Sequence, residues 1–389
     1  MTYRIRTLNA ISQAGLSRLP ADRFDVGPDI ADPQALLLRS ANLHNQPIPA
    51  SVLAVARAGA GTNNIPVAEF SKRGIPVFNT PGANANAVKE LVVAGIFLAA
   101  RNIVDAAAFA HRLEGDHATM DKLVEAGKRN FVGFELPGRT LGVIGLGAIG
   151  VEVANVAISL GMRVLGYDPA ITVEHAWSLS AKVERVATLE QLLKRSDIVT
   201  VHVPLVDGTR NLIGAAEFAA MKSSAVLINF ARGAIVNEEA LIAALERNEL
   251  RGYVCDFPTP TLNKRPRVVT LPHLGASTRE AEENCALMAA DQLRDYLLNG
   301  TIRNSVNFPR ADLPRTEGHQ RITIANANVP NMVAQISALL GEANLNIADL
   351  LNGSRGEVAY TQVDVGGPVP DALVTSLRGV RGVLSARRI

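Results

Sequence analysis

Three glycines close together in the chain have the spacing of a phosphate-binding turn. They form the pattern GxGxxG over residues 145–150, which are Gly145, Leu146, Gly147, Ala148, Ile149 and Gly150. In such a turn the first glycine permits a tight bend, the second lets backbone approach a pyrophosphate, and the third allows a helix to pack closely on a strand. The free N–H groups at the start of the next helix, aided by its dipole, then bind the phosphates. The stretch therefore predicts dinucleotide binding.

The residues around the glycines supply the context that this prediction requires. Residues 140–145 are typical of a strand, and a helical pattern follows them. Asp168 lies 18 residues after Gly150, at the end of the next predicted strand. Its carboxylate can accept hydrogen bonds from both ribose hydroxyls and would repel a 2′-phosphate. The sequence thus favours NAD over NADP as cofactor.

The elements that position this motif form a predicted α/β unit. Further strands are expected at residues 163–167, 198–202, 225–229, 252–255 and 268–271, with helical segments between most of them. Long helices are expected at residues 86–109 and 277–298, the second opening with a capping-box pattern. Between the first helix and the glycine motif we expect a polar, irregular connection at residues 115–138.

Two further regions flank this unit. Before residue 80, aliphatic stretches such as residues 35–38 and 52–55 alternate with helical segments and turns, which indicates a first α/β layer. Residues 309–318 contain two prolines and mixed charges and predict a linker. Residues 319–389 then follow the order βαββαβ of a ferredoxin-like unit.

Composition limits the class of protein. A chain of 389 residues is long enough for two or three domains, and 48% apolar with only 4% aromatic residues suits α/β architecture. The net charge of +2 offers no broad field for nucleic acid or an anionic membrane, so we expect a small-molecule partner.

Cysteine usage and hydropathy predict a cytoplasmic protein. Cys255 and Cys285 have no metal-ligand spacing, so we expect reduced thiols and no metal. Residues 1–11 alternate like a strand and do not form a signal peptide. The most apolar run, residues 91–100, is about half the length that spans a bilayer and predicts a buried helix.

Several segments together resemble the D-isomer-specific 2-hydroxyacid dehydrogenases and, within that family, the branch that oxidises 3-phosphoglycerate at the start of serine synthesis. They are residues 38–40 (LRS), 57–63 (RAGAGTN), 74–81 (GIPVFNTP), the glycine motif, 229–233 (NFARG) and 272–278 (PHLGAST). The resemblance implies two Rossmann-like, doubly wound parallel-sheet domains, with the active site in the cleft. The substrate domain would comprise residues 1–95 and 276–312, and the NAD domain, residues 96–275, would be inserted into it.

The resemblance also implies which side chains carry the reaction. His273 matches the family's acid/base, and an imidazole suits this role because its pKa lies near neutrality. Arg232 matches the arginine that holds the substrate carboxylate and polarises the C2 oxygen. Pro204, Ala231 and Asp256 would join the glycine motif and Asp168 in the cofactor site.

A second set of residues matches the family's substrate site. Arg39, Ser40 and Arg57 match positions near the phosphate or carboxylate, and the Gly59 loop can form an anion nest. Asn79 ends a strand that we expect at the same cleft edge. Together they predict a doubly anionic substrate.

One family residue is missing. The family pairs its histidine with a glutamate that raises the histidine pKa, but Pro260 or Thr261 occupies that position here. No Asp or Glu occurs from residue 257 through 279, so a shifted loop cannot supply one. Asp256 is a candidate substitute, although it could equally face the nicotinamide amide. We expect either a histidine with a lowered pKa and an acid-shifted reduction rate, or NAD binding with slow turnover.

Residues 317–389 resemble an ACT domain, a small module that binds amino acids at a dimer interface. Asn328 and Asn346 match positions that hold serine in related dehydrogenases, whereas Asn326 replaces a histidine of that site. Side-chain amides can bind a zwitterion. The alternative is a domain that serves only for oligomerisation, because a sheet edge can pair without ligand.

The leading hypothesis is NAD-dependent oxidation of 3-phospho-D-glycerate to 3-phosphohydroxypyruvate by a homodimer or homotetramer, with serine as effector. A second hypothesis is a dehydrogenase or reductase for another 2-hydroxy or 2-keto acid, against which Arg39, Arg57 and the C-terminal domain argue. A third, kept open by the missing glutamate, is an NAD-binding regulatory protein with little turnover.

Overall fold

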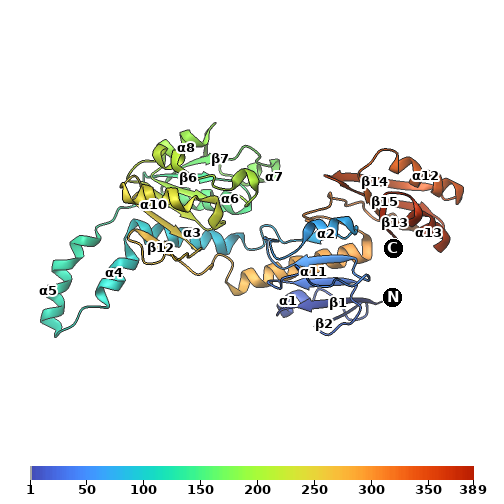
Figure 1. Cartoon of the computed structure of the whole chain (residues 1–389), viewed down its shortest axis with the longest axis horizontal. Coiled ribbons are helices and arrows are strands. Elements are labelled where there is room, and N and C mark those ends of the chain that lie inside the picture. Colours follow the sequence, from blue (N-terminus) through green and yellow to red (C-terminus); the bar gives the residue numbers. More distant parts are fainter. Residues whose placement is uncertain (1) are drawn as a thin grey trace. The chain divides into compact units, whose positions relative to one another are not determined.

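The computed structural model describes residues 2–389, and contacts within it divide the chain into two compact units. One unit comprises Met1–Asn84 and Arg279–Ile389, and the other is Ala85–Thr278. The second unit is therefore inserted into the first along the chain, as the family resemblance implies. Figure 1 shows the elements in sequence colours.

The first unit contains a parallel sheet with the strand order β2-β1-β3-β4-β5. Its strands are β1 (Tyr3–Leu8), β2 (Phe24–Gly27), β3 (Ala35–Leu38), β4 (Ala54–Arg57) and β5 (Val77–Phe78), with helices α1 (Gln13–Leu16), α2 (Val67–Lys72) and α11 (Arg279–Asn299). All four residues of β3 are buried. This explains its unbroken aliphatic sequence, because a central strand of a parallel sheet is covered on both faces. Helix α11 packs on this core through buried residues such as Leu293 and Tyr296.

The second unit is built on a longer parallel sheet with the order β12-β11-β10-β9-β6-β7-β8. The strands are β6 (Thr140–Ile144), β7 (Arg163–Tyr167), β8 (Glu184–Arg185), β9 (Ile198–Val201), β10 (Val226–Asn229), β11 (Gly252–Cys255) and β12 (Val268–Thr270). Helices α3 (Ala85–Ala100), α6 (Ala148–Ser159), α7 (Val173–Ser178), α8 (Leu189–Arg195), α9 (Ala215–Ala220) and α10 (Glu238–Glu246) accompany them, with short turns η2 (Asp207–Thr209) and η3 (Gly233–Ile235). Within this unit β6 is the first strand along the chain, and the later strands lie on both sides of it. This is a doubly wound arrangement.

Two expectations about residues 86–138 were wrong. The expected helix 86–109 is broken: Asn102 has a left-handed backbone (φ 50°), and α4 (Ile103–Ala110) turns away from α3 by 65°. The expected irregular connection contains α5 (His117–Gly127) and η1 (Lys128–Phe131). Asp116 caps α5 by accepting a hydrogen bond from the Thr119 N–H. In Figure 1, α4 and α5 run away from the sheet of their unit.

The boundary between the first two domains also differs from the expected position at residues 95 and 96. That position lies inside α3, whereas contacts assign the whole helix to the second unit. The reason is packing: a Cβ added at Gly95 would lie 2.9 Å from the Phe230 ring, so α3 lies tightly on the end of β10.

Residues 319–389 form an antiparallel sheet of the order β14-β15-β13-β16. The elements are β13 (His319–Ala327), α12 (Met332–Glu342), β14 (Ile347–Arg355), β15 (Val358–Gly366), α13 (Asp371–Gly379) and β16 (Val383–Arg388). This confirms the βαββαβ order expected from the sequence. Strand β14 lies at one edge of the sheet.

The C-terminal sheet is attached to the end of α11 through a buried arginine. Arg321 on β13 is fully buried and pairs in a bidentate manner with Asp364 on β15, at 2.6 and 2.7 Å. Its remaining N–H groups donate to the carbonyls of Asn299, Leu313 and Pro314. One side chain thus joins two strands, the end of α11 and the linker.

None of the single helices within residues 2–389 is long and apolar enough to cross a membrane, although the bent pair α3 and α4 meets that length and composition together. Within α3, the apolar run contributes Val92, Ile96 and Ala100 to the core, as the sequence predicts.

Candidate active site

The residues that the sequence assigns to cofactor and chemistry gather along one edge of the second sheet. All neighbouring strands in this sheet are parallel, so their carboxyl ends share an edge. In spatial order along it, from β12 to β7, the strands are followed by His273, Asp256, Arg232, His202, Gly145 and Asp168. The crevice at which strand order reverses, between β9 and β6, is where ligands of open α/β sheets bind.

The glycine turn has the geometry that dinucleotide binding requires. Gly145 has a φ of 89°, and a side chain there would meet the carbonyl of His202. A Cβ at Gly150 would collide with the carbonyl of Gly145, so only glycine lets α6 approach β6 this closely. A Cβ at Gly147 would meet nothing within 4 Å among the described residues, which leaves room for a pyrophosphate at the N-terminus of α6.

Asp168 is fixed beside this turn. One carboxylate oxygen accepts from the Leu146 N–H and the other from the Ala170 N–H, both at 2.8 Å. The carboxylate is only partly exposed. It therefore has a defined position at the end of β7, where the ribose of a bound dinucleotide would lie.

His202 is a residue of this edge that the sequence analysis missed. It follows β9, its N–H donates to the Ile144 carbonyl, and its Nε2 lies 2.9 Å from Thr200 Oγ1. Burial lowers the pKa of His202 to about 3, so its imidazole is neutral at physiological pH. The sequence feature that could have identified His202 is its position at the end of an apolar, buried strand. Pro204, two residues later, is exposed on the loop that follows.

Arg232 follows β10 in a structured turn. The Asn229 amide donates to the Arg232 carbonyl at 2.9 Å and accepts from the Ala231 N–H at 3.1 Å. The Arg232 guanidinium is half-buried and donates to the Ala231 carbonyl. This turn holds a positive charge at the edge while leaving other N–H groups of the fork for a ligand.

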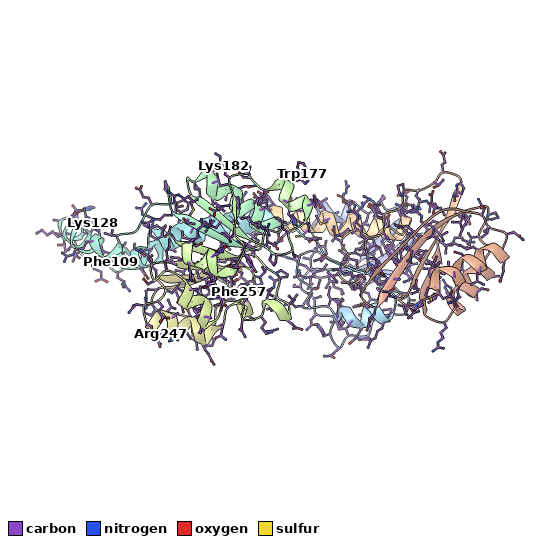
Figure 2. All side chains as sticks on the ribbon, turned by 90° about the horizontal axis from the view of Figure 1, so that it is seen from above. Phe109, Lys128, Trp177, Lys182, Arg247 and Phe257 are labelled. Carbon is purple, nitrogen blue, oxygen red and sulfur yellow. The ribbon has the colours of Figure 1, made fainter. Side chains whose placement is uncertain are left out.

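His273 and Asp256 are joined through the backbone. His273 has a left-handed φ of 53°, and its N–H donates to the Asp256 carbonyl at 3.0 Å. The imidazole is exposed, and its ring centroid lies 5.3 Å from that of Phe257. Phe257 is labelled in Figure 2. Non-glycine residues with such a backbone are uncommon and deserve a functional explanation.

Asp256 is a buried acid, and it stands next to His273 in the spatial order of residues along this edge. Only 1% of Asp256 is exposed; Oδ2 accepts from the Gly275 N–H at 3.2 Å, and Oδ1 is buried without a partner among residues 2–389. Burial raises the pKa of Asp256, while the bond from Gly275 and the charges of His273 and Arg232 oppose the rise. One oxygen therefore remains available to a ligand or to the histidine.

The loop that lacks the family glutamate is held by a different carboxylate. Thr261 donates a hydrogen bond to Glu238, at the start of α10, and lies 3.0 Å from Thr259 Oγ1. Pro260 between them has no side-chain donor or acceptor. Of the two positions that could match the glutamate, residue 261 holds a hydroxyl bonded to Glu238, and residue 260 holds a proline.

The predicted substrate residues gather at the carboxyl edge of the first sheet. Arg39 and Ser40 follow β3, Arg57 ends β4 and Asn79 follows β5. The Asn79 amide donates to the Ala60 carbonyl at 2.6 Å, which fixes the glycine-rich loop. A Cβ at Gly59 would collide with Nη1 of Arg57, so the guanidinium lies against this loop. The structure thus brings all five predicted residues to one edge.

The predicted effector residues do not meet within one chain. Asn326 is buried, and its amide donates to the Ala327 carbonyl at 2.7 Å. Asn328 lies near Gly356, to whose carbonyl it donates at 3.0 Å. Asn346, by contrast, accepts through its carbonyl from Gly366, which pairs with His319 at the other end of β13. Asn328 and Asn346 therefore lie at opposite ends of the same sheet.

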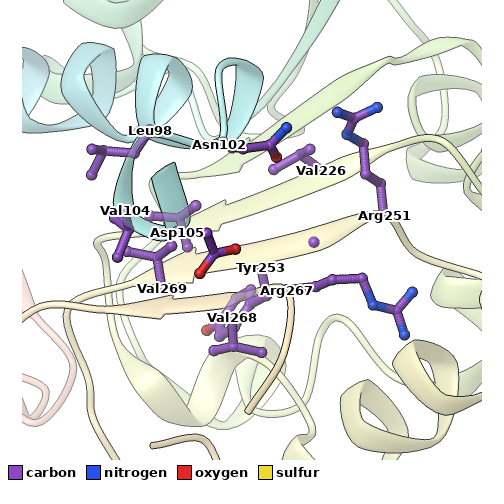
Figure 3. Close-up of a pocket in the computed structure, with 13 residues that line it drawn as sticks. Leu98, Asn102, Val104, Asp105, Val226, Arg251, Tyr253, Arg267, Val268 and Val269 are labelled. Carbon is purple, nitrogen blue, oxygen red and sulfur yellow. The ribbon is translucent and has the colours of Figure 1, made fainter. Parts of the chain in front are cut away.

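Neither of two surface hollows in the second unit coincides with the carboxyl edge. A pocket of about 70 Å³, shown in Figure 3, lies under α3 and α4, and Asn102, Val104, Val226 and Arg251 are among the residues that line it. It has room for only a few waters. A hollow of about 680 Å³ lies near Thr140 and Arg163, where β6 and β7 begin, and two of its cations are paired with Glu184 and Asp197.

Comparisons with known proteins agree with this geometry. A family model described as "D-isomer specific 2-hydroxyacid dehydrogenase, NAD binding domain" matches residues 96–275. The D-3-phosphoglycerate dehydrogenase of Haemophilus influenzae is 35% identical over 347 residues, 86% of this chain and 81% of that protein. The enzyme of the same name from Escherichia coli K12 is 35% identical over 340 residues, 84% of this chain and 79% of its own length.

Solved structures share the fold. NAD⁺-bound 3-phosphoglycerate dehydrogenase of Entamoeba histolytica aligns with a TM-score of 0.62 and 25% identity, covering 79% of this chain and 99% of its own. The D-mandelate dehydrogenase of Rhodotorula graminis aligns with a TM-score of 0.68 and 26% identity, covering 81% and 100%.

Proposed function

Because this chain belongs to the D-isomer-specific 2-hydroxyacid dehydrogenase family, we propose that it oxidises 3-phospho-D-glycerate to 3-phosphohydroxypyruvate with NAD, the first step of serine synthesis. The observation that carries this function is the 35% identity to 3-phosphoglycerate dehydrogenases over more than four fifths of the chain. Two arginines at the carboxyl edge of the first sheet, Arg39 and Arg57, support the phosphorylated substrate, because a phosphate needs cations in addition to Arg232, which we assign to the carboxylate.

The residues of the second unit fit an NAD cofactor. The open space at Gly147 and the N-terminus of α6 suit the pyrophosphate, and the anchored Asp168 carboxylate suits the adenosine ribose. Bound NAD supplies the hydride acceptor. Oδ1 of Asp256 has no partner among residues 2–389, which supports a role in accepting a hydrogen bond from the nicotinamide amide or from His273.

The protein's own groups handle the proton and the charge. His273 takes the proton of the C2 hydroxyl as hydride leaves C2, and returns it when the keto acid is reduced. Arg232 binds the substrate carboxylate and stabilises the developing charge on the C2 oxygen. Arg39, Ser40, Arg57 and the Gly59 loop, with Asn79 supporting that loop, hold the phosphate.

The test is oxidation of NADH by the purified protein with 3-phosphohydroxypyruvate or unphosphorylated hydroxypyruvate, from about pH 5 to about pH 9. Strong preference for the phosphorylated keto acid is the expected result. Preference for the unphosphorylated compound, or for another 2-keto acid, would replace this substrate by another of the same class. NADH binding without turnover of any 2-keto acid would favour an NAD-sensing regulatory protein, an alternative supported by the absence of a glutamate at residues 260 and 261.

We further propose that residues 317–389 are an ACT domain that binds serine between two copies of the chain. Asn328 lies beside the turn that follows β14, and Asn346 lies just before β14 begins. If two copies pair their β14 edges in antiparallel fashion, Asn346 of one copy lies near Asn328 of the other. This supports a site completed by assembly, and a serine-dependent change in activity or melting temperature tests it.

Homo-oligomer formation is also supported by the arm formed by α4, α5 and η1. Every residue of α4 is at least partly exposed. Large apolar side chains of the arm are about 40% exposed or more, namely Ile103, Val104, Leu123 and Val124, and so is Val132, which follows η1 directly. Phe109 and Lys128, labelled in Figure 2, lie on this arm. Such exposed apolar surface typically marks an interface. We place the enzyme in the cytoplasm, because its two cysteines are free thiols in the described chain.

A further inference from the structure

Helix α11 places an acidic side chain against one of the two arginines that we assign to the substrate phosphate. Glu282 Oε1 lies 2.7 Å from Arg39 Nη1, and the two side chains are 44% and 39% exposed. Glu282 lies in the first turn of α11, and Arg39 follows β3. Arg39 therefore already holds an anion that the chain itself provides.

Cys285 lies close to this pair and to Arg57, the other arginine that we assign to the phosphate. Cys285 lies one turn after Glu282 and is buried. Burial raises the pKa of the Cys285 thiol; the neighbouring Thr80 hydroxyl and the positive charges of Arg57 and Arg39 oppose the rise, and the negative charge of Glu282 adds to it. Both arginines and the glutamate therefore act on one buried point beneath the carboxyl edge.

The helix that carries Glu282 is fixed against the same loops. Gln292, 7% exposed, donates from Nε2 to the Asn79 carbonyl at 3.0 Å. At Gly15 of α1 a Cβ would lie 2.6 Å from atoms of Ala286, so α1 and α11 are in close contact. Glu282 thus has a defined place beside Arg39.

We propose that Glu282 is a specificity-determining residue: its carboxylate holds Arg39 until the substrate phosphate displaces it, and its negative charge then limits how tightly a dianion is bound. The inference rests on the proposed function, since it assigns Arg39 to the phosphate. An ion pair between half-exposed side chains is weak, so Glu282 cannot exclude a phosphate. A phosphate makes stronger, charge-assisted bonds with a guanidinium and therefore displaces the Glu282 carboxylate from Arg39.

The experiment compares KM for 3-phosphohydroxypyruvate and for hydroxypyruvate in the wild type, Glu282→Gln and the matched control Glu280→Gln, whose position is exposed on the same helix. Glu282→Gln is expected to lower KM for the phosphorylated substrate about fivefold, the scale of a weak exposed pair, and to leave KM for hydroxypyruvate unchanged. Glu280→Gln should have the wild-type KM for both substrates. Glu282→Asp keeps the carboxylate, so its KM should stay close to the wild-type value.

A double-mutant cycle separates this role from a structural one. In an Arg39→Gln background the effect of Glu282→Gln on KM should disappear, because the carboxylate acts through that arginine. Equal KM changes for both substrates, or an unchanged effect without Arg39, would overturn the inference.

If the wild type turns over neither keto acid, the proposed function fails and a binding measurement still decides the inference. With saturating NADH, the rise in melting temperature caused by inorganic phosphate is compared among the same variants. A larger rise in Glu282→Gln than in the wild type and Glu280→Gln would support competition for Arg39, and equal rises would refute it.

Discussion

At the residue scale, the central question is how His273 works without the family's glutamate. The structure leaves its imidazole exposed, and the backbone N–H of His273 donates to the Asp256 carbonyl. The Asp256 carboxylate is buried, interacts electrostatically with His273 and Arg232, and has one oxygen without a partner among the described residues. Asp256 is therefore the strongest candidate to stabilise a protonated His273.

The variant Asp256→Asn tests this role. Removing the negative charge should shift the pH profile of keto-acid reduction toward lower pH and lower the reduction rate near neutral pH about tenfold. The measurement is the pH profile of kcat/KM for the keto acid, with NADH affinity as a control for cofactor binding. A neutral-pH profile with unchanged rate in Asp256→Asn would exclude Asp256 as the substitute and the expected acid shift together.

His202 makes a separate prediction about stability. Its pKa is 6.5 in an unfolded chain and about 3 when folded, because burial disfavours the charged ring. Between these two values the unfolded chain binds a proton that the folded chain does not, so stability falls as pH falls through that window. The slope reaches at most about 1.4 kcal/mol per pH unit.

Replacing His202 by Gln should remove this dependence while keeping a polar partner for Thr200. We expect urea unfolding at pH 7 and pH 5 to differ less in His202→Gln than in the wild type, with the free energy of unfolding as the measured quantity. Identical losses in the two proteins would contradict the assignment of a buried neutral ring. Asp256 is present in both proteins, so its titration contributes equally to both changes in the free energy of unfolding and cancels in their difference.

At the element scale, the arm of α4, α5 and η1 is the feature least explained by a single chain. The rings of Phe109 and Phe131 pack against each other, with their centroids 5.3 Å apart, and hold the arm together. The apolar side chains on its outside have no comparable cover within residues 2–389, as their exposure shows. A second copy of the chain is the occupant that we propose.

Charges on this arm should weaken assembly without unfolding the chain. Leu123 and Val124 are 40% and 41% exposed, so Leu123→Glu with Val124→Glu removes little core packing. We expect the dissociation constant to rise at least about tenfold, a change of about 1.4 kcal/mol. Sedimentation velocity measures it, and Lys122→Glu on the same helix is the control. A monomeric wild type, or a double variant that assembles normally, would show that the arm has another role.

The sequence predicted elements well where burial is complete and poorly where it is not. Strands β9, β10 and β11 are buried throughout, and their unbroken apolar runs identify them. Helix α5 buries only Gly127, so no apolar face marks it, although Asp116 supplies a cap. The break at Asn102 depends on bonds from its amide to the carbonyls of Phe131 and Val132, about thirty residues away. Such a contact cannot be inferred from local pattern.

Some residues of the candidate site could likewise be predicted from the sequence, and others could not. The glycine turn and Asp168 were predictable because their spacing carries a mechanism, whereas Arg232 and His273 depended on resemblance. His202 was missed since an isolated histidine has no spacing signal. The bond between Thr261 and Glu238 joins a loop to a helix start that local sequence does not connect.

At the scale of the whole molecule, α11 connects the predicted anion site to the C-terminal sheet. Its first turn carries Glu282, and its last turn offers carbonyls to the C-terminal domain. Arg387 donates to the carbonyls of Tyr296 and Leu297, and its guanidinium lies 4.2 Å from the centre of the Tyr296 ring. Tyr360 donates to the Gly300 carbonyl at 2.9 Å. Residues 319–389 are therefore packed on the end of α11, within the same unit, rather than tethered by a free linker.

Arg321 is the side chain on which this attachment depends most. All five of its N–H donors are used, two of them by Asp364, in a site that excludes water. Arg321→Met would leave the Asp364 charge buried and unpaired, which should lower the free energy of unfolding by about 3 to 5 kcal/mol. Adding Asp364→Leu removes that charge and should restore part of the loss. The carbonyls of Asn299, Leu313 and Pro314 would remain without their donor, so about 1 to 3 kcal/mol should not return.

Urea unfolding of the two variants measures both changes, and the shape of the transition tests the coupling. If the arginine couples the C-terminal sheet to α11, the double variant should unfold that sheet in a separate, earlier transition. Its contacts with α11 and the linker are then weakened, while its own core of Ile324, Leu340 and Val363 is intact. Serine should then raise the melting temperature of the C-terminal sheet without changing KM for the keto acid. A double variant that unfolds with the wild-type transition and keeps the wild-type response to serine would show that the other contacts of α11, rather than Arg321, join the two parts.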